Sequence, residues 1–162
     1  PLNTNGNAQA LAAADLLIDE QLSLIVSSPL KRALQTSTAV SERLGVPISI
    51  DPQLMERSFG SLEGRPLKEI APDAHSGFHV ASSTMLPPDS EPWEQVCTRV
   101  LYTVDNWLCA HPAKKLLFVS HYGVLSALSQ KLCGTPAPVK NATPLRFVPS
   151  GGGWEMIEVS RC

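Results

Sequence analysis

The chain has 162 residues, of which 43% are hydrophobic and 17% charged, and its formal net charge is −2. This balance is typical of an ordinary globular protein and argues against a nucleic-acid-binding surface or a disordered tail. The length predicts a single domain over residues 1–162. The longest apolar runs, such as residues 116–119, are far shorter than the roughly 20 residues of a membrane span, so no membrane partner is expected.

The first half of the chain alternates helical and strand-like patterns. Asn3 is a favourable N-cap, and apolar residues recur at helical spacing for about four turns after it. Residues 22–27 form a short apolar run of the kind found in strands that are buried on both faces. Ser28 and Pro29 predict the next helix start, with Ser28 as the N-cap, and a second strand follows that helix at residues 48–50.

The second half begins with a long irregular segment. Residues 65–92 are rich in proline and small polar residues, with one helical turn suggested near residues 66–70, which predicts a variable substrate-side loop or lid. The pattern then predicts a helix, a strand, a helix and two closing strands, at residues 93–108, 116–120, 123–132, 145–148 and 154–159. The expected fold class is therefore α/β, a three-layer sandwich around a mostly parallel sheet with an antiparallel edge.

The cysteines show no C-x-x-C spacing, and three of the four fall in helical patterns. We therefore expect buried thiols rather than a disulfide framework or a metal site, in agreement with a reducing compartment. No charged and apolar leader is visible, so a cytoplasmic location is expected. The four residues are Cys97, Cys109, Cys133 and Cys162.

Two junctions between a predicted strand and a predicted helix carry polar residues, and ligands of such sheets bind at these junctions. At the first, Arg32 lies in the first turn of the helix that follows residues 22–27. Its guanidinium could hold two oxygens of a phosphate in a planar fork, helped by the helix N-terminus. The alternative is a solvated first-turn side chain, although a cation is slightly unfavourable there.

At the second junction, His121 leaves a buried strand and Gly123 stands where the next helix starts. Backbone N–H groups there can bind an anion, and the imidazole can add a hydrogen bond or a charge. The alternative is a structural histidine that is satisfied inside the protein. Between the junctions, Glu56 and Glu63 lie amid apolar residues and glycines, where either could position a general acid or be a loop charge.

In their sequence and in their order along the chain, these segments resemble those of the histidine phosphatases, the phosphoglycerate-mutase-like superfamily of branch 1. The resemblance extends over residues 2 to 160. The similar segments are, in chain order, residues 2–10 (the helix entry that follows the family's nucleophile), 28–36 (its second arginine motif), 54–64 (its acid loop) and 120–124 (its second-histidine motif).

This resemblance implies a role for each matching residue. Arg32 and His121 would form half of a phosphate pocket, supported by backbone amides of Tyr122 and Gly123, and Glu56 would donate a proton to the leaving oxygen. The family's nucleophilic histidine lies in an Arg-His-Gly motif on a first, central strand, and this sequence contains no such tripeptide. We therefore expect that this strand is absent from the 162 residues, which would lack the covalent step and leave strands unpaired unless a homodimer exchanges one.

The function implied is a phosphomonoester hydrolase that works through a phosphohistidine, on a small phosphorylated metabolite or inorganic phosphate and without a cofactor. Phosphoglycerate mutase is one alternative, disfavoured because residues 65–92 are few and hold only Arg65 and Lys68 as cations. A non-catalytic phosphate-binding or interaction domain is the other alternative. It would keep the fold without the nucleophile.

The substrate side of the pocket is less defined by the sequence. Residues that could line it are Arg57, His75, Phe78, His79 and Trp93. His75 and His79 have the spacing of a zinc pair, but no third ligand accompanies them, so no metal is expected.

Overall fold

The computed structural model describes residues 1–65, 86–137 and 140–160. Short 3-10 turns lie at Ile18–Glu20, Pro52–Leu54 and Gly60–Leu62. The longer elements, in chain order, are α1 (Thr4–Leu16), β1 (Leu24–Ser27), α2 (Lys31–Leu44), β2 (Ile48–Ile50), α4 (Trp93–Ala110), β3 (Leu116–Val119), α5 (Tyr122–Cys133), β4 (Leu145–Ser150) and β5 (Gly153–Glu158). The predicted order of helices and strands is confirmed over these residues. The suggested turn near residues 66–70 lies outside them.

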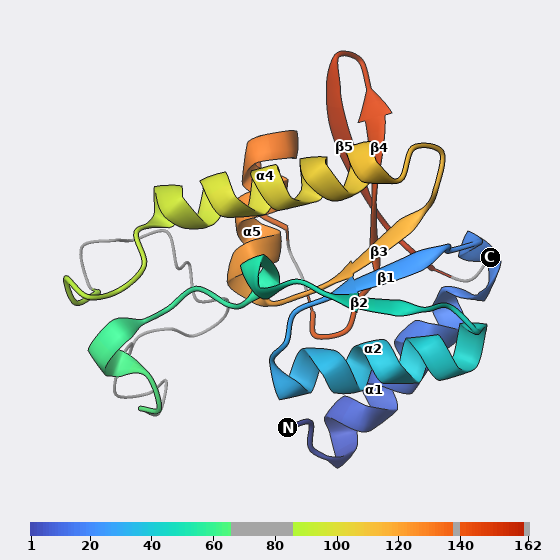
Figure 1. The fold of residues 1–162 in the computed structure, drawn as a ribbon, viewed down its shortest axis with the longest axis horizontal. Coiled ribbons are helices and arrows are strands. Elements are labelled where there is room, and N and C mark those ends of the chain that lie inside the picture. The colour runs from blue at the N-terminus through green and yellow to red at the C-terminus, as the bar shows by residue number, and fades with distance from the viewer. Residues whose placement is uncertain (66–85, 138–139, 161–162) are drawn as a thin grey trace.

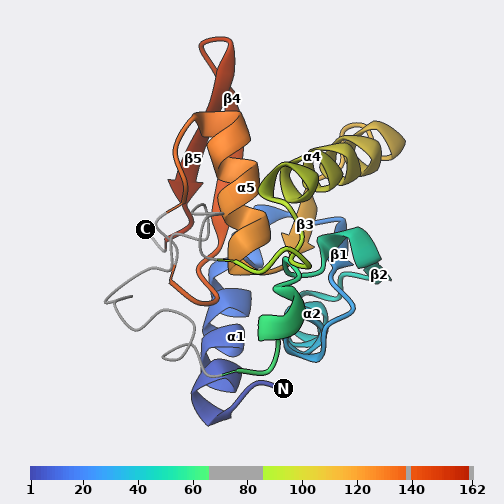
Figure 2. The same ribbon diagram turned by 90° about the vertical axis from the view of Figure 1, so that its left-hand side faces the viewer.

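The centre of the fold is a three-stranded parallel sheet in which β1 lies between β2 and β3. Helices α1 and α2 lie on one side of this sheet, and α4 and α5 lie on the other (Figures 1 and 2). β1 reads as a fully apolar run because both of its faces are covered, and Ile25 and Val26 are completely buried. The predicted α/β fold with helices on both faces is therefore confirmed.

The closing hairpin is placed differently from the expectation. β4 and β5 pair antiparallel around Gly151 and Gly152, whose φ angles of 55° and 91° suit glycine in a tight hairpin turn. Among the described strands, however, this pair forms a sheet of its own instead of an edge of the parallel sheet. No backbone ladder joins β4 to β3, and β4 contacts the rest of the domain through side chains such as Phe147, which packs on the core between α4 and α5.

The starts of the first two helices also differ in how well they were predicted. Asn3 caps α1 as expected, its side-chain oxygen accepting from the Gly6 N–H at 2.8 Å. Ser28 was expected to cap α2, and this was wrong: the chain stays extended through Leu30, which is the N-cap of α2 and provides no side-chain cap. Ser28 is completely buried, and its hydroxyl is engaged elsewhere.

Two separate hydrophobic clusters hold the layers together. The first lies between the sheet and α1 and α2, and it is built on Ala14, Leu17, Ile25, Val40 and Val46. The second lies between α4 and α5 and is built on Val96, Cys97, Val100, Val124, Ala127 and Leu128. The candidate site therefore forms where two independently packed halves of the domain meet.

The cysteines of the described residues differ in their exposure. Cys97, Cys109 and Cys133 are free thiols. The expectation of burial is confirmed for Cys97 and wrong for Cys109, which is exposed on α4, whereas Cys162 lies outside the described residues. Within the described ranges, none of the helices combines the length and apolarity that a bilayer crossing requires.

Candidate functional site

Arg32 and His121 come together because their strands are neighbours. β1 and β3 pair in parallel with Ser27 opposite Val119, so the residues that follow both strands meet at one edge of the sheet. Arg32 lies in the first turn of α2, and His121 is the N-cap of α5. The Arg32 Nε–H donates to His121 Nδ1 at 3.1 Å, across 89 residues of chain.

The hydrogen bonds of His121 define its tautomer. A guanidinium nitrogen can only donate, so Nδ1 of His121 must be the acceptor and the ring proton of the neutral imidazole resides on Nε2. Nε2 lies 2.8 Å from the Ser28 hydroxyl oxygen, which therefore accepts this proton. Ser28 Oγ also accepts the backbone N–H of Leu30 at 3.3 Å. Ser28 thus takes a place in the site instead of capping the helix.

His121 is only 8% exposed, and its environment keeps it neutral. Burial first, and then the positive charges of Arg32 and Arg99, together lower the pKa of His121 to about 4. At neutral pH the imidazole is therefore an uncharged hydrogen-bond partner. The local positive charge comes from Arg32.

Arg32 is exposed, and its bond to His121 uses only Nε. The two terminal Nη groups have no hydrogen-bond partner among the described residues. They form the end of the guanidinium that can hold two oxygens of one phosphate group. The neutral histidine fixes the direction in which this fork points.

Glu56 lies beside the N-terminus of α5, where it contacts Gly123, the second residue after His121. Its Oε1 accepts the N–H of Arg57 at 2.9 Å, and its Oε2 accepts the N–H of Gly123 at 3.4 Å. A Cβ at position 123 would lie 2.5 Å from Glu56 Oε1, so a glycine is needed to admit the carboxylate. A carboxylate is also favoured electrostatically at this end of a helix. The structure thus places one acid beside the N-terminus of α5.

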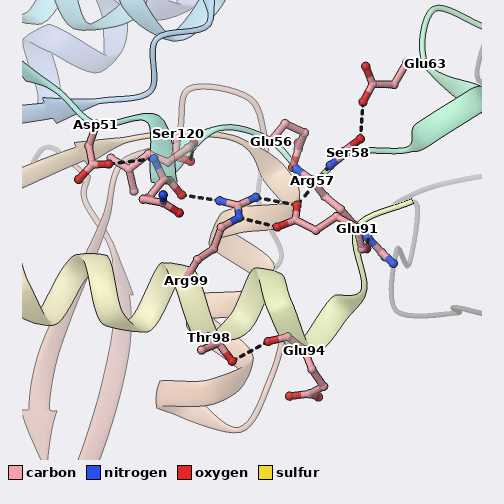
Figure 3. A network of polar contacts seen from close by, with 12 residues as sticks. Asp51, Glu56, Arg57, Ser58, Glu63, Glu91, Glu94, Thr98, Arg99 and Ser120 are labelled. Atoms are coloured by element: carbon pink, nitrogen blue, oxygen red, sulfur yellow. Dashed lines mark hydrogen bonds and ion pairs between the residues drawn. The ribbon is translucent and has the colours of Figure 1, made fainter. Parts of the chain in front are cut away.

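Glu63, the other acid of the loop, has a different environment. Its Oε1 accepts the hydroxyl of Ser58 at 2.8 Å and the N–H of Phe59 at 3.2 Å. These bonds close the loop on itself, as Figure 3 shows for Ser58 and Glu63. Of the two acids left open by the sequence, Glu56 is therefore the one that approaches α5.

Arg57 was predicted to line the substrate side of the pocket. Its side chain lies between the acid loop and the start of α4. It is 3% exposed, its Nε donates to the carbonyl oxygen of Glu91 at 2.7 Å, and its guanidinium carbon lies 5.6 Å from the ring centre of Trp93. Burial lowers the pKa of Arg57, while the charge of Glu91 opposes that shift. A contact of Arg57 or Trp93 with substrate stays a prediction. His75, Phe78 and His79 lie outside the described residues.

Sequence reasoning missed four side chains of this region. Ser28 and Ser120 both directly follow a buried strand, which is a signal that could have found them; the Ser120 hydroxyl donates to the Leu54 carbonyl at 2.7 Å. Glu91 and Arg99 gave no signal beyond the helix that contains Arg99, because their partners lie in a distant loop (Figure 3). Among the described residues no group of three or more ligand-type side chains could hold a metal ion.

Comparison with known proteins relates these residues to a family. The model of the histidine phosphatase superfamily (branch 1) matches residues 1–158. A glucosyl-3-phosphoglycerate phosphatase of Mycolicibacterium vanbaalenii is 34% identical over 145 residues, which cover 83% of this chain and 64% of that protein. A probable phosphoglycerate mutase GpmB of Yersinia pestis is 29% identical over 149 residues, covering 90% of this chain and 69% of that protein.

A solved structure is similar over nearly the whole chain. The complex of a mycobacterial glucosyl-3-phosphoglycerate phosphatase with inorganic phosphate superimposes with a TM-score of 0.78 and 28% sequence identity. The match covers 96% of this chain and 85% of that structure. The chain spans 64% and 65% of the length of the two curated relatives that match it first, just under two thirds.

Proposed function

Since this chain belongs to the histidine phosphatase superfamily, branch 1, we propose that it provides the phosphate pocket and the proton donor of a phosphomonoester hydrolase. The observation that carries the proposal is the contact of Arg32 with His121 at 3.1 Å, beside a carboxylate that reaches the N-terminus of α5. Cation, neutral imidazole and acid then surround one point at the carboxyl edge of the sheet. This is the arrangement that transfer of a phosphoryl group requires.

Each residue has a task in the proposed reaction. The Nη groups of Arg32 bind two phosphate oxygens, and His121 with the amide of Tyr122 completes the pocket. The Gly123 amide, which was also expected there, donates to Glu56. A histidine nitrogen attacks phosphorus as the bond to the leaving oxygen breaks, and the protonated carboxyl of Glu56 gives that oxygen its proton. Water then attacks the phosphohistidine and returns a proton to Glu56. The products are an alcohol and inorganic phosphate.

The nucleophile of this reaction is the part that the 162 residues do not supply. We propose that it lies on an additional strand with an Arg-His-Gly sequence that pairs with β3. Support comes from β3 itself: its four apolar residues are only partly buried, and among the described strands it is hydrogen-bonded to β1 alone. The 162 residues alone would then bind phosphate without turning over substrate.

The substrate proposed is a small phosphorylated metabolite. Support comes from the relatives, whose names refer to glucosyl-3-phosphoglycerate and, for a protein of Arabidopsis thaliana, to metal-independent phosphoserine phosphatase activity. The pocket would act in the cytoplasm, where the free thiols of Cys97 and Cys109 remain reduced. No cofactor takes part in the proposed steps.

The test is a phosphatase assay on the protein made from the full reading frame that encodes this chain, alongside the 162 residues alone. We expect the full protein to hydrolyse p-nitrophenyl phosphate and phosphoserine, with vanadate as an inhibitor, and the 162 residues to bind vanadate only. A full protein that binds vanadate and hydrolyses no phosphate ester would favour the non-catalytic binding domain. Absence of vanadate binding by both forms would contradict the proposal.

Phosphoglycerate mutase is the second candidate, favoured by the likeness to GpmB of Yersinia pestis. Both reactions share the phosphohistidine and differ in the acceptor, which is water for a phosphatase and a second hydroxyl for a mutase. Incubation of the full protein with 3-phosphoglycerate separates them. Release of inorganic phosphate supports the phosphatase, whereas formation of 2-phosphoglycerate supports the mutase.

A further inference from the structure

The pair formed by Glu91 and Arg99 has no assigned role in the site and is the best-formed ion pair of the described residues. Arg99 Nε lies 2.6 Å from Glu91 Oε1 and Nη2 lies 2.9 Å from Oε2, so both ends of the carboxylate are held. The two side chains are each only 18% exposed. Burial by itself raises the pKa of Glu91, but the hydrogen bond and charge of Arg99 outweigh it and hold the pKa below its usual value. The pair is charged at neutral pH.

The side chains of this pair form hydrogen bonds with the acid loop on both sides of Glu56. On the earlier side, Arg99 Nη1 donates to the carbonyl oxygen of Gln53. On the later side, Ser58 is bound twice by Glu91: its N–H donates to Glu91 Oε2 at 3.3 Å, and its carbonyl oxygen accepts the Glu91 N–H at 2.9 Å. Figure 3 shows Arg99 on α4 and Glu91 on the segment that precedes α4, both facing the acid loop.

Glu56 depends on these hydrogen bonds because its own carboxylate is held by few contacts. The bonds described for its carboxylate come from two backbone N–H groups, of Arg57 within the loop and of Gly123 in α5. The second bond is long, at 3.4 Å, and therefore weak. The position of the carboxylate thus depends on the backbone of residues 53–58. Arg99 and Glu91 hold this backbone at Gln53 and Ser58, and Ser120 holds it at Leu54.

We propose that Glu91 and Arg99 are positioning residues that hold Glu56 at the distance needed to protonate the leaving oxygen. This inference rests on the proposed function. Neither side chain makes a described hydrogen bond to Arg32 or His121, so the pair acts on the reaction through the acid loop. The charge of Arg99 also lowers the pKa of His121, and Arg99→Lys keeps that charge. Loss of the pair displaces the proton donor and leaves the Arg32 fork in place.

The dependence on leaving group separates positioning of an acid from general support of the fold. p-Nitrophenolate leaves without a proton, whereas the alkoxide of phosphoserine needs one, so a misplaced Glu56 harms only the second substrate. Arg99→Lys keeps the charge but cannot hold Gln53 and both carboxylate oxygens at once. Glu91→Gln keeps the shape and removes the charge. We expect kcat/KM for phosphoserine to fall about 10- to 100-fold in either variant, and that for p-nitrophenyl phosphate to fall less than about threefold.

The matched control is Glu94→Gln, which removes a second ion pair of the same helix. Glu94 lies 3.1 Å from Lys131, is 76% exposed on its side-chain surface and does not contact the acid loop. We expect both substrates to be unaffected in this variant. Equal losses for the two substrates in Arg99→Lys, or no loss for either, would overturn the positioning role.

A second measurement decides the inference even if the proposed function fails. The amide of Gly123 donates to Glu56, so its NMR shift should follow the titration of that carboxyl in the unmodified protein and lose this dependence in Glu56→Gln. We expect the titration amplitude of the Gly123 amide to fall by more than about half in Arg99→Lys and to stay unchanged in Glu94→Gln, since the 3.4 Å contact is sensitive to small displacements. An unchanged amplitude in Arg99→Lys would contradict the inference.

Discussion

Arg32 and His121 stand directly at the ends of β1 and β3, on the first turn and the N-cap of regular helices. Glu56, in contrast, lies on a loop of 3-10 turns that is attached to α4 by side chains. The proposed phosphate side of the site therefore takes its geometry from the sheet, and the proposed proton-donor side takes its geometry from a few polar contacts. The two sides should respond differently to substitution, because a sheet edge is far harder to displace than a loop.

The largest effect is expected on the phosphate side. Arg32→Ala removes the fork that holds two phosphate oxygens, so vanadate binding should weaken at least about 100-fold and kcat/KM should fall about 1,000-fold. Vanadate titration and steady-state kinetics measure these losses. The control is Lys31→Ala, because Lys31 is an exposed cation of the same helical turn. Comparable losses in both variants would mean that the helix carries a general positive field and not a specific fork.

The next effect should fall on the proton-donor side alone. In Gly123→Ala the new methyl group would lie 2.5 Å from Glu56 Oε1 and must push the carboxylate away. We expect kcat for phosphoserine to fall about 10- to 100-fold while vanadate affinity changes less than about threefold. Gly153→Ala is the control, since the nearest atom to its added Cβ is 3.9 Å away. A parallel loss of vanadate affinity would show that the two sides are not separable.

A smaller effect is expected from Ser28→Ala, which leaves the Nε2 proton of His121 without its acceptor. The free energy of unfolding should fall by about 1–3 kcal/mol, and phosphate affinity by about three- to tenfold because the Arg32 fork loses its orientation. Urea denaturation and phosphate titration provide the two values. Ser37→Ala removes another buried hydroxyl, which donates to Ser27 Oγ at 2.7 Å, and should cost stability without changing affinity.

The smallest effect concerns pH. The pKa of His121 is lowered to about 4 in the folded protein and is near 6.5 in an unfolded chain, so the unfolded state binds more protons between these values. Stability should therefore fall as the pH drops from 6.5 to 4, by about 1–2 kcal/mol from this residue after allowance for its partial exposure. Urea midpoints at pH 7, 5.5 and 4.5 measure the slope. His121→Gln should flatten it, and identical slopes would contradict the assignment.

The contrast between the two sides also explains what could be foreseen from the sequence. Arg32 and His121 were predictable because a buried strand followed by a helix start places a side chain at the ligand edge of the sheet. Ser28 was assigned to the helix cap, since local sequence shows the capping tendency of serine but not the imidazole that arrives 93 residues later. The hydrogen bond from Arg99 to the Gln53 carbonyl could not be foreseen. It joins residues 46 positions apart, and neither residue has a local pattern that requires the other.

The contact between Glu56 and Gly123 has a consequence for anyone who redesigns this pocket. The two positions are coupled: a Cβ at position 123 would lie 2.5 Å from Glu56 Oε1, so the carboxylate must shift to admit a side chain there. Shortening the acid by one methylene in Glu56→Asp withdraws its oxygens and makes room for Gly123→Ala. The double variant should therefore be less impaired than the sum of its parts predicts. Libraries that vary residue 56 or residue 123 alone would discard both Glu56→Asp and Gly123→Ala. The two codons should therefore be randomised together.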